Sequence, residues 1–214
     1  MANSSNGNCF ICGAELGKTA MKNHVLKTHN DPAGDEICYL MKAEGAYDKN
    51  FWLLFDVALD KSLSSVDTFL RKIWLECCGH MSAFRGQYGE IGKNRKIRSL
   101  QAGEKLLHEY DFGSTTETLI TVIGEIRRPK QRGAVRLLAR NVPPVMICET
   151  CGEPADLICL DCMYDDVNPF FCKACAEKHE QKHDMFLSAV NSPRMGECGY
   201  EGEQDVWTFD PSKY

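Results

Sequence analysis

The sequence predicts an α+β protein, with a mostly antiparallel sheet and one main helix, flanked by two small zinc-binding modules. Most cysteines and histidines gather toward the two ends of the 214-residue chain, whereas the middle holds one helical apolar stripe among several β-prone runs. Those runs do not alternate with helices, as a parallel sheet would require. The expected parts are a zinc finger (1–30), a linker (31–47), an α+β domain (48–144), a two-zinc module (145–186) and a tail (187–214).

Composition narrows the class of protein before any motif is considered. The hydrophobic fraction of 43% and charged fraction of 26% are ordinary for a globular chain and argue against a wholly disordered one. The first eight residues lack the basic start and apolar core of a secretory signal, and no apolar run reaches the ~20 residues that span a bilayer. We therefore expect a cytoplasmic protein without a membrane partner, whose 12 cysteines serve first as metal ligands.

The first metal-ligand pattern is formed by Cys9, Cys12, His24 and His29. A two-residue gap between cysteines lets one tight turn present both thiolates to a tetrahedral zinc ion. The spacing resembles that of a Cys-Cys-His-His zinc finger, and a module this short needs its metal in order to fold. A single finger is weak evidence for DNA binding, so a finger that contacts protein or stabilises the fold is at least as well supported.

The central segment begins after a connector. Residues 31–47 contain helix breakers and acids and are interpreted as a linker, whereas 51–59 is bulky, β-prone and interpreted as a buried strand. A helix is expected from a serine cap at Ser64 to Cys77, with one apolar stripe and a stop at Gly79. Further strands are expected at 81–88, 105–110, 118–126 and 134–139.

Two motifs in this segment carry a family resemblance. The predicted helix leads into a Gly79–His80 step, and a Tyr-Asp-Phe-Gly motif follows at 110–113. Over about residues 48 to 141 the chain resembles the root-inducing (Ri) plasmid ORF-three-like family, and the tail 191–200 is similar to the end of its longer members. The resemblance implies an α+β fold and a link to mobile elements, but no reaction. Family members commonly end the second motif with Asp, where this chain has Ser114.

The same motifs allow a structural and a functional interpretation. Asp111 followed by Gly113 is typical of a turn, in which the carboxylate accepts bonds from nearby backbone amides. Alternatively, His80, His108 and Asp111 converge, together with Glu117, in the site of an enzyme of unknown reaction. No residue is assigned a catalytic role. Cys77 falls in the apolar stripe and is interpreted as a small buried side chain, while Cys38 and Cys198 have no neighbouring pair of ligands.

The second metal-ligand pattern contains eight residues in four pairs, which implies two further zinc ions and three in total. His179 and His183 are four apart, so on a helix they share one face. The arrangement resembles a B-box cross-brace, in which alternate pairs would share an ion, although sequential pairing remains open. Four protein ligands leave no position for a catalytic water, so these sites are expected to be structural. The ligands are Cys148, Cys151, Cys159, Cys162, Cys172, Cys175, His179 and His183.

Charge is distributed unevenly along the chain. The net charge of −5 resolves into +6 over residues 92–141 and −11 elsewhere. Two basic clusters in the middle could contact a nucleic-acid backbone, or could simply be solvated loops. We therefore expect a non-enzymatic adaptor that joins a nucleic-acid or protein partner to another protein through the zinc modules. The clusters contain Lys93, Arg95, Lys96, Arg98, Arg127, Arg128, Lys130 and Arg132.

Overall fold

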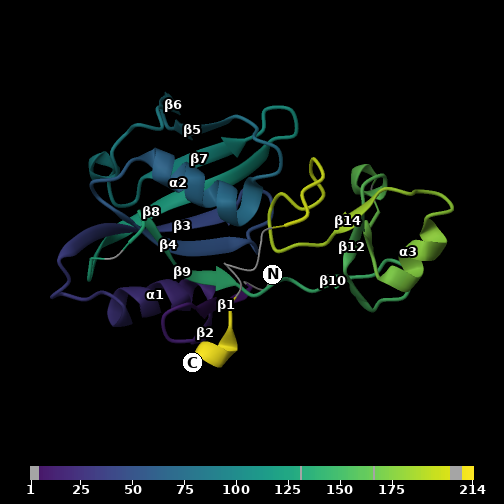
Figure 1. Ribbon diagram of the computed structural model, residues 1–214, viewed down its shortest axis with the longest axis horizontal. Helices are drawn as coiled ribbons and strands as arrows, with labels where there is room; N and C mark the ends of the chain where they lie inside the picture. Colours follow the sequence, from purple (N-terminus) through teal and green to yellow (C-terminus); the bar gives the residue numbers. More distant parts are fainter. Residues whose placement is uncertain (1–4, 131, 166, 203–208) are drawn as a thin grey trace.

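The computed structural model describes residues 5–130, 132–165, 167–202 and 209–214, and its centre is a nine-stranded sheet (Figure 1). The strands follow the order β2-β1-β9-β4-β3-β8-β7-β5-β6, and each neighbouring pair is antiparallel. The predicted α+β class with a mostly antiparallel sheet is confirmed. The strands are β1 (Asn6–Cys9), β2 (Glu15–Gly17), β3 (Glu36–Gly45), β4 (Trp52–Ala58), β5 (Ser82–Gly86), β6 (Gly89–Ile91), β7 (Lys105–Tyr110), β8 (Thr116–Arg128) and β9 (Val135–Asn141).

One helix covers each face of this sheet. Helix α1 (Lys18–Thr28) packs on a face that includes Leu54, and α2 (Leu63–Leu70) packs on the opposite face, which includes Phe55. Successive side chains of a strand point to opposite faces, so β4 supplies both cores and is buried along its whole length. The helix of the expected finger is therefore one of the layers of the central domain.

Helix α2 is shorter than the sequence predicted. Its N-cap is Ser62 rather than Ser64, and after Leu70 the chain continues as a π-helical turn, Arg71–Leu75. The wider turn ends when the Glu76 N–H donates to the Arg71 carbonyl, so Cys77 lies beyond the helix. The apolar stripe itself is confirmed, because its members Val66, Phe69, Leu70, Ile73 and Trp74 are buried.

The predicted linker 31–47 is wrong over most of its length. It contains β3, which lies between β4 and β8 near the middle of the sheet. The breakers Pro32 and Gly34 precede the strand, and a strand buried on both faces reads as an apolar run without alternation. The finger is also part of the central sheet, because its strand β1 pairs with the last residues of β9.

The C-terminal module forms its own small core beside the central sheet (Figure 1). Its last strand ends at Ser188, slightly beyond the predicted boundary at 186. The tail then returns to the central domain, where the Asn191 carbonyl accepts a hydrogen bond from Arg140. The module consists of β10 (Met146–Ile147), β11 (Pro154–Ala155), β12 (Leu157–Cys159), a 3-10 turn (Cys162–Tyr164), β13 (Phe170–Phe171), α3 (Lys173–His179) and β14 (Phe186–Ser188).

Over the described parts of the chain, no helix is both long enough and apolar enough to cross a bilayer.

Candidate metal centres

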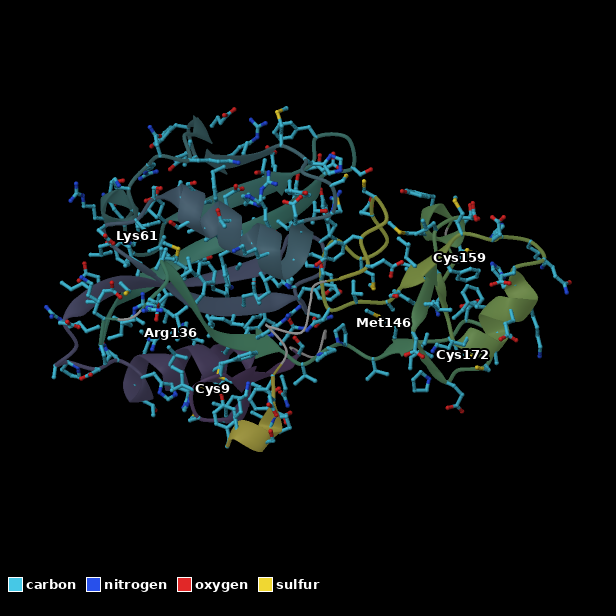
Figure 2. The ribbon with its side chains drawn as sticks, viewed as in Figure 1. Cys9, Lys61, Arg136, Met146, Cys159 and Cys172 are labelled. Carbon is cyan, nitrogen blue, oxygen red and sulfur yellow. The ribbon has the colours of Figure 1, made fainter. Side chains whose placement is uncertain are left out.

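The first group of ligands lies where β1 meets the start of the finger turn, and Cys9 is labelled there in Figure 2. Gly13 has a positive φ of 74° and donates its N–H to the Cys9 carbonyl, which closes the turn that carries Cys12. His24 lies on α1 and His29 follows at its C-cap. The Sγ of Cys12 is 3.2 Å from His24 Nε2, and the Sγ of Cys9 is 3.3 Å from His29 Nε2.

These distances suit a four-coordinate cation. A tetrahedral ion with metal–sulfur bonds of about 2.3 Å and metal–nitrogen bonds of about 2.0 Å separates its donors by roughly 3.3 to 3.8 Å. The Nε2 atoms of His24 and His29 are 3.1 Å apart, and all four donors lie within 4.8 Å of one another. The residues therefore already stand near the corners of one tetrahedron and could hold a metal ion.

The eight C-terminal ligands divide into two groups by alternate pairs. One group is Cys148, Cys151, Cys172 and Cys175, and the other is Cys159, Cys162, His179 and His183, so the sequential pairing left open by the sequence does not occur. In the first group the Sγ atoms of Cys151 and Cys172 are 3.7 Å apart. In the second, His179 Nε2 is 3.3 Å from Cys162 Sγ and 3.1 Å from His183 Nδ1. Figure 2 labels Cys159 and Cys172, one member of each group.

The crowding of thiols shifts their pKa values in opposite directions. Burial raises the pKa of Cys148, but backbone hydrogen bonds from Cys172, Cys151 and Thr150 outweigh burial and lower that pKa to about 6. The hydrogen bond with Cys172, followed by burial, raises the pKa of Cys175 to about 12. Adjacent thiols cannot all ionise without a compensating cation, and a bound metal would supply that charge.

A fourth group brings together Cys77, Cys78, His80 and Cys198, which the sequence did not connect as one set of ligands. His80 Nε2 is 2.9 Å from Cys78 Sγ and 3.2 Å from Cys198 Sγ. The prediction that Cys77 is simply a buried apolar side chain is therefore incomplete, although it does pack partly against the core. The Cys-Cys-Gly-His spacing was the available signal, but Cys198 is 120 residues from Cys78 and no local pattern connects them.

Cys38 differs from the other cysteines. It is fully buried in the core beneath α1 and belongs to none of the four groups. Burial, reinforced by the charge of Asp56, raises its thiol pKa to about 11, as expected of a structural side chain.

The three residues of the proposed enzyme site do not all meet. His80 Nδ1 lies 3.4 Å from Asp111 Oδ1, but His108 is fully buried on β7 and its Nε2 lies 2.8 Å from Asp67 Oδ1 on α2. Glu117 is on β8, paired with Glu109 across the sheet. The structure thus brings His80 and Asp111 together and separates His108 from them.

His108 and Asp67 belong to a buried polar network that ties α2 to the sheet. Ser82 Oγ donates to Asp67 at 2.6 Å and Lys93 Nζ lies 3.1 Å from the same carboxylate. Burial raises the pKa of Asp67, but its hydrogen bonds, first from His108 and then from Ser82, hold it well below its usual range. Burial lowers the pKa of His108 more than Asp67 raises it, so the imidazole is neutral. The network is a structural connection between two elements.

The eight basic residues have different environments. Arg128 is buried, and its guanidinium lies 2.8 Å from Asp56 and 2.9 Å from Glu36, so its assignment to an exposed basic surface is corrected. Lys93 is paired with Asp67 as described above, and Arg95 Nη1 is 2.8 Å from Glu104. The exposed members are Lys96, Arg98, Arg127, Lys130 and Arg132.

Backbone pairing connects the two basic clusters through Leu59 and Ile37. The Arg98 N–H donates to the Leu59 carbonyl at 3.1 Å, and the Leu59 N–H donates to the Ile37 carbonyl at 3.1 Å. Ile37 is in turn the register partner of Arg127 across β3 and β8. Residues separated by almost thirty positions in the sequence are therefore brought near one another, as the charge pattern alone could not establish.

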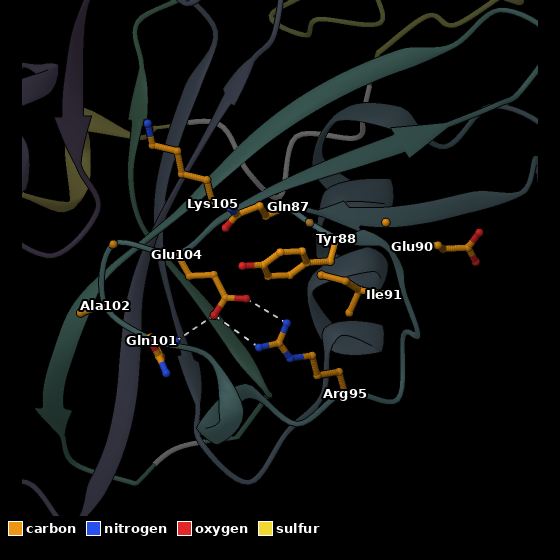
Figure 3. Close-up of a pocket in the computed structure, with 12 residues that line it drawn as sticks. Gln87, Tyr88, Glu90, Ile91, Arg95, Gln101, Ala102, Glu104 and Lys105 are labelled. Carbon is orange, nitrogen blue, oxygen red and sulfur yellow. Dashed lines mark hydrogen bonds and ion pairs between the residues drawn. The ribbon is translucent and has the colours of Figure 1, made fainter.

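A separate hollow of about 880 Å³ lies beside the β5–β6 hairpin (Figure 3). Tyr88 and Ile91 line it from the hairpin, and Arg95 and Glu104 form an ion pair at its wall. Glu90 and Lys105 also line the hollow, and Figure 3 shows them at opposite sides of it, so the charged side chains drawn there do not gather into one group for acid–base or nucleophilic chemistry.

Comparison with known proteins adds little to this geometry. No protein-family model matches the chain, and no curated protein matches it. Among solved structures it is similar to the crystal structure of a protein of unknown function from Methanosarcina mazei Go1, with 15% sequence identity and a TM-score of 0.40. That match covers 49% of this chain and 67% of the other.

Proposed function

We propose that this protein is a zinc-dependent, non-enzymatic adaptor that binds a protein partner through its C-terminal module. The observation that carries the proposal is the closed geometry of the three predicted groups, each with four Cys or His donors within 4.8 Å. Four protein donors occupy all coordination positions of a tetrahedral zinc ion and leave none for a substrate or an activated water. Zinc ions in these groups would hold a binding surface in shape.

The surface of the C-terminal module supports a protein partner. Tyr164 is 75% exposed, Val145 70% and Met185 53%, and Ile147 and Val167 are about half exposed. Five exposed apolar side chains on one small module favour an interaction surface there. The module extends beside the central sheet, so these side chains are accessible to a second protein (Figure 1).

A nucleic-acid partner is the second candidate, and the convergence of the two basic clusters favours it. Lys96, Arg98 and Arg127 are exposed, and backbone pairing through Leu59 and Ile37 connects Arg98 with Arg127, so these residues would release counterions from a phosphate backbone. We also propose that the chain is related to the Ri plasmid ORF-three-like family. The link of that family to mobile elements agrees with a nucleic-acid partner.

The competing proposal is an enzyme with a site around His80, His108 and Asp111. It requires His108 to reach a substrate, yet this imidazole is fully buried against Asp67. The adaptor is therefore the better supported function.

The protein-binding proposal is tested on material purified from the native host. We expect Val145→Asp combined with Tyr164→Ala to abolish a co-purifying partner, while Tyr88→Ala, at an exposed position of the β5–β6 turn, leaves the complex intact. Zinc content is measured in parallel and should not change in either variant. Retention of the partner by the double variant, with zinc content unchanged, would reject the module as the binding surface.

The nucleic-acid candidate is tested by fluorescence anisotropy with a labelled DNA duplex. Arg98→Glu and Arg127→Glu together should weaken binding and flatten its salt dependence, by a slope of about 0.9 for each phosphate that the protein no longer neutralises. Lys178→Glu, an exposed charge reversal on the C-terminal module, is the matched control. Binding that is equally tight at low and moderate salt would contradict this candidate.

A further inference from the structure

We propose that Cys77, Cys78, His80 and Cys198 form a fourth metal site, which takes a zinc-like divalent cation and fastens the C-terminal tail to the central domain. Three donors come from the turn after the π-helical segment, and the fourth comes from the tail. The inference goes beyond the proposed adaptor function, because neither the three predicted zinc groups nor the binding surfaces depend on it.

The positions of the four donors fit a tetrahedral ion. Thiolates about 2.3 Å from a central zinc lie about 3.8 Å apart. The Sγ atoms of Cys77 and Cys78 are separated by 3.8 Å, and those of Cys78 and Cys198 by 3.7 Å. A disulfide needs sulfurs about 2.05 Å apart, so the geometry favours ligands of a shared ion. Sulfur-rich donor sets select zinc-like ions over magnesium or calcium.

Backbone conformation at this group is unusual. Within the described parts of the chain, Asp111 and Cys198 are the two non-glycine residues with positive φ, at 65° and 49°. Such conformations cost free energy and persist where the surroundings hold them, frequently at functional sites. Cys198 is a ligand of the proposed ion and Asp111 contacts the ligand His80. Two strained residues from distant parts of the sequence thus belong to one site.

Asp111 has the position of a carboxylate that orients a metal-bound histidine. His80 presents Nε2 to the cysteine sulfurs, while its Nδ1 lies 3.4 Å from Asp111 Oδ1. Metal-ligating histidines usually donate their other ring N–H to such a carboxylate. Asp111 is itself held by the Gly113 N–H at 3.0 Å, so it is a positioning residue for His80.

Arg194 supplies the charge that this donor set requires. Three thiolates, one neutral imidazole and a divalent ion carry a net charge of −1, and Asp111 adds another negative charge. Arg194 is fully buried, with Nη2 2.8 Å from Asp111 Oδ2 and 3.5 Å from Cys77 Sγ. Its guanidinium also stacks on the Tyr110 ring at 4.8 Å. The tail therefore brings both a ligand and a cation to the site.

Metal content of the full-length chain tests the site directly. Protein expressed with added zinc and purified under reducing conditions should contain four zinc ions per chain. Cys198→Ser should contain three, while Cys38→Ala, which removes a cysteine outside all four groups, should retain four. Three zinc ions in the wild type, or equal content in the wild type and Cys198→Ser, would overturn the proposal.

Cobalt substitution and intact mass measurement check the metal count independently. Sulfur-to-cobalt charge-transfer absorption reports the number of thiolate ligands, which should fall from eleven to eight when the fourth site is lost. Unchanged absorption in Cys198→Ser would contradict the site. A wild-type mass lower by two hydrogens than that of the fully reduced chain, with no such deficit in Cys198→Ser, would identify a disulfide formed by Cys198 and overturn the proposal as well.

The Asp111→Asn variant tests whether Asp111 positions His80 for metal binding. Loss of a carboxylate partner of a metal-bound histidine typically weakens metal affinity by about 10- to 100-fold. Competition with a chromophoric chelator should show that loss for one of the four ions only, with the affinities of the other three unchanged. Equal affinities in the variant and the wild type would reject the assigned role of Asp111.

Hydrogen exchange tests whether the ion fastens the tail. Amides of residues 191–200 should exchange faster in Cys198→Ser than in the wild type, whereas those of β3 and β8 should not change. Identical exchange across 191–200 would show that the hydrogen bonds of Asn191, Ser192 and Arg194 hold the tail without the ion, and would reject the proposal that the ion fastens it.

Discussion

The N-terminal ligand group and the C-terminal module use similar donors in different surroundings. The finger helix packs on the central sheet through Met21 and Val25, and β1 is hydrogen-bonded to β9. Among the described residues of the C-terminal module, six buried side chains form its core, of which Cys148, Cys159 and Cys162 are also ligands. Metal binding should therefore supply most of the folding free energy of the module and only part of that of the finger.

The largest predicted effect is the unfolding of the C-terminal module by Cys172→Ser. Structural zinc contributes about 10–16 kcal/mol to a small domain, far more than a core of six residues can replace. Hydrogen exchange should become fast across residues 145–188 while β3, β4 and β8 stay protected. Cys38→Ala is the control, and protection that survives in the module of Cys172→Ser would show that its fold does not depend on this metal.

A smaller effect is expected when the core shared by the finger and the sheet is disturbed. Trp52 is fully buried, and its indole N–H donates to Ser5 Oγ at 2.9 Å. Trp52→Ala should lower the free energy of unfolding of the central domain by about 3–5 kcal/mol and weaken metal binding by the finger. Denaturant unfolding followed by circular dichroism measures the first effect, and Tyr88→Ala is the exposed control.

The affinity of the C-terminal module for zinc should not change in Trp52→Ala. Metal competition with a chelator measures this, because the two regions do not share a core. Weakened zinc binding by both the finger and the C-terminal module would show that the two regions are not independent.

Loss of the finger metal should leave the sheet intact. Cys12 is exposed, so Cys12→Ser removes a ligand without opening a cavity. We expect one zinc ion to be lost, faster exchange along α1, and a loss of about 0.5–3 kcal/mol in the stability of the central domain. Unfolding of the central sheet in this variant would show that the sheet depends on the finger metal as strongly as the C-terminal module depends on its own metals.

Much of this architecture could be predicted from local patterns. Lys105–Tyr110 matched its predicted strand, and the apolar stripe of α2 identified the helix that covers one face. The twelve predicted metal ligands fall into three groups, because each pair lies close in the sequence and spacing alone restricts its geometry. Local chemistry was sufficient wherever a single turn or helix presents the ligands.

The errors arose where distant segments determine the outcome. A strand buried on both faces, β3, lacks the alternation that marks an exposed sheet, and the preceding Pro32 and Gly34 suggested a linker instead. Cys198 meets Cys78 only because the tail folds back onto the central domain, which no local spacing reveals. Arg128 belonged to a basic cluster by sequence but faces Asp56 across the sheet.

The smallest predicted effect is a change in the stability of the central domain with pH, which comes from the buried His108 and not from loss of metal. Burial keeps His108 neutral in the folded state, whereas an unfolded histidine takes up a proton below a pH of about 6.5. The unfolded state therefore binds more protons, so the contribution of His108 to stability is present above that pH and falls as the pH decreases. His108→Gln removes this response and can still donate to Asp67. Its stability relative to the wild type should rise by about 1 kcal/mol between pH 7.5 and 5.5, as measured by denaturant unfolding. Protonation of the metal ligands affects both proteins equally and cancels in the difference, so a constant difference across this range would show that the buried histidine is not neutral.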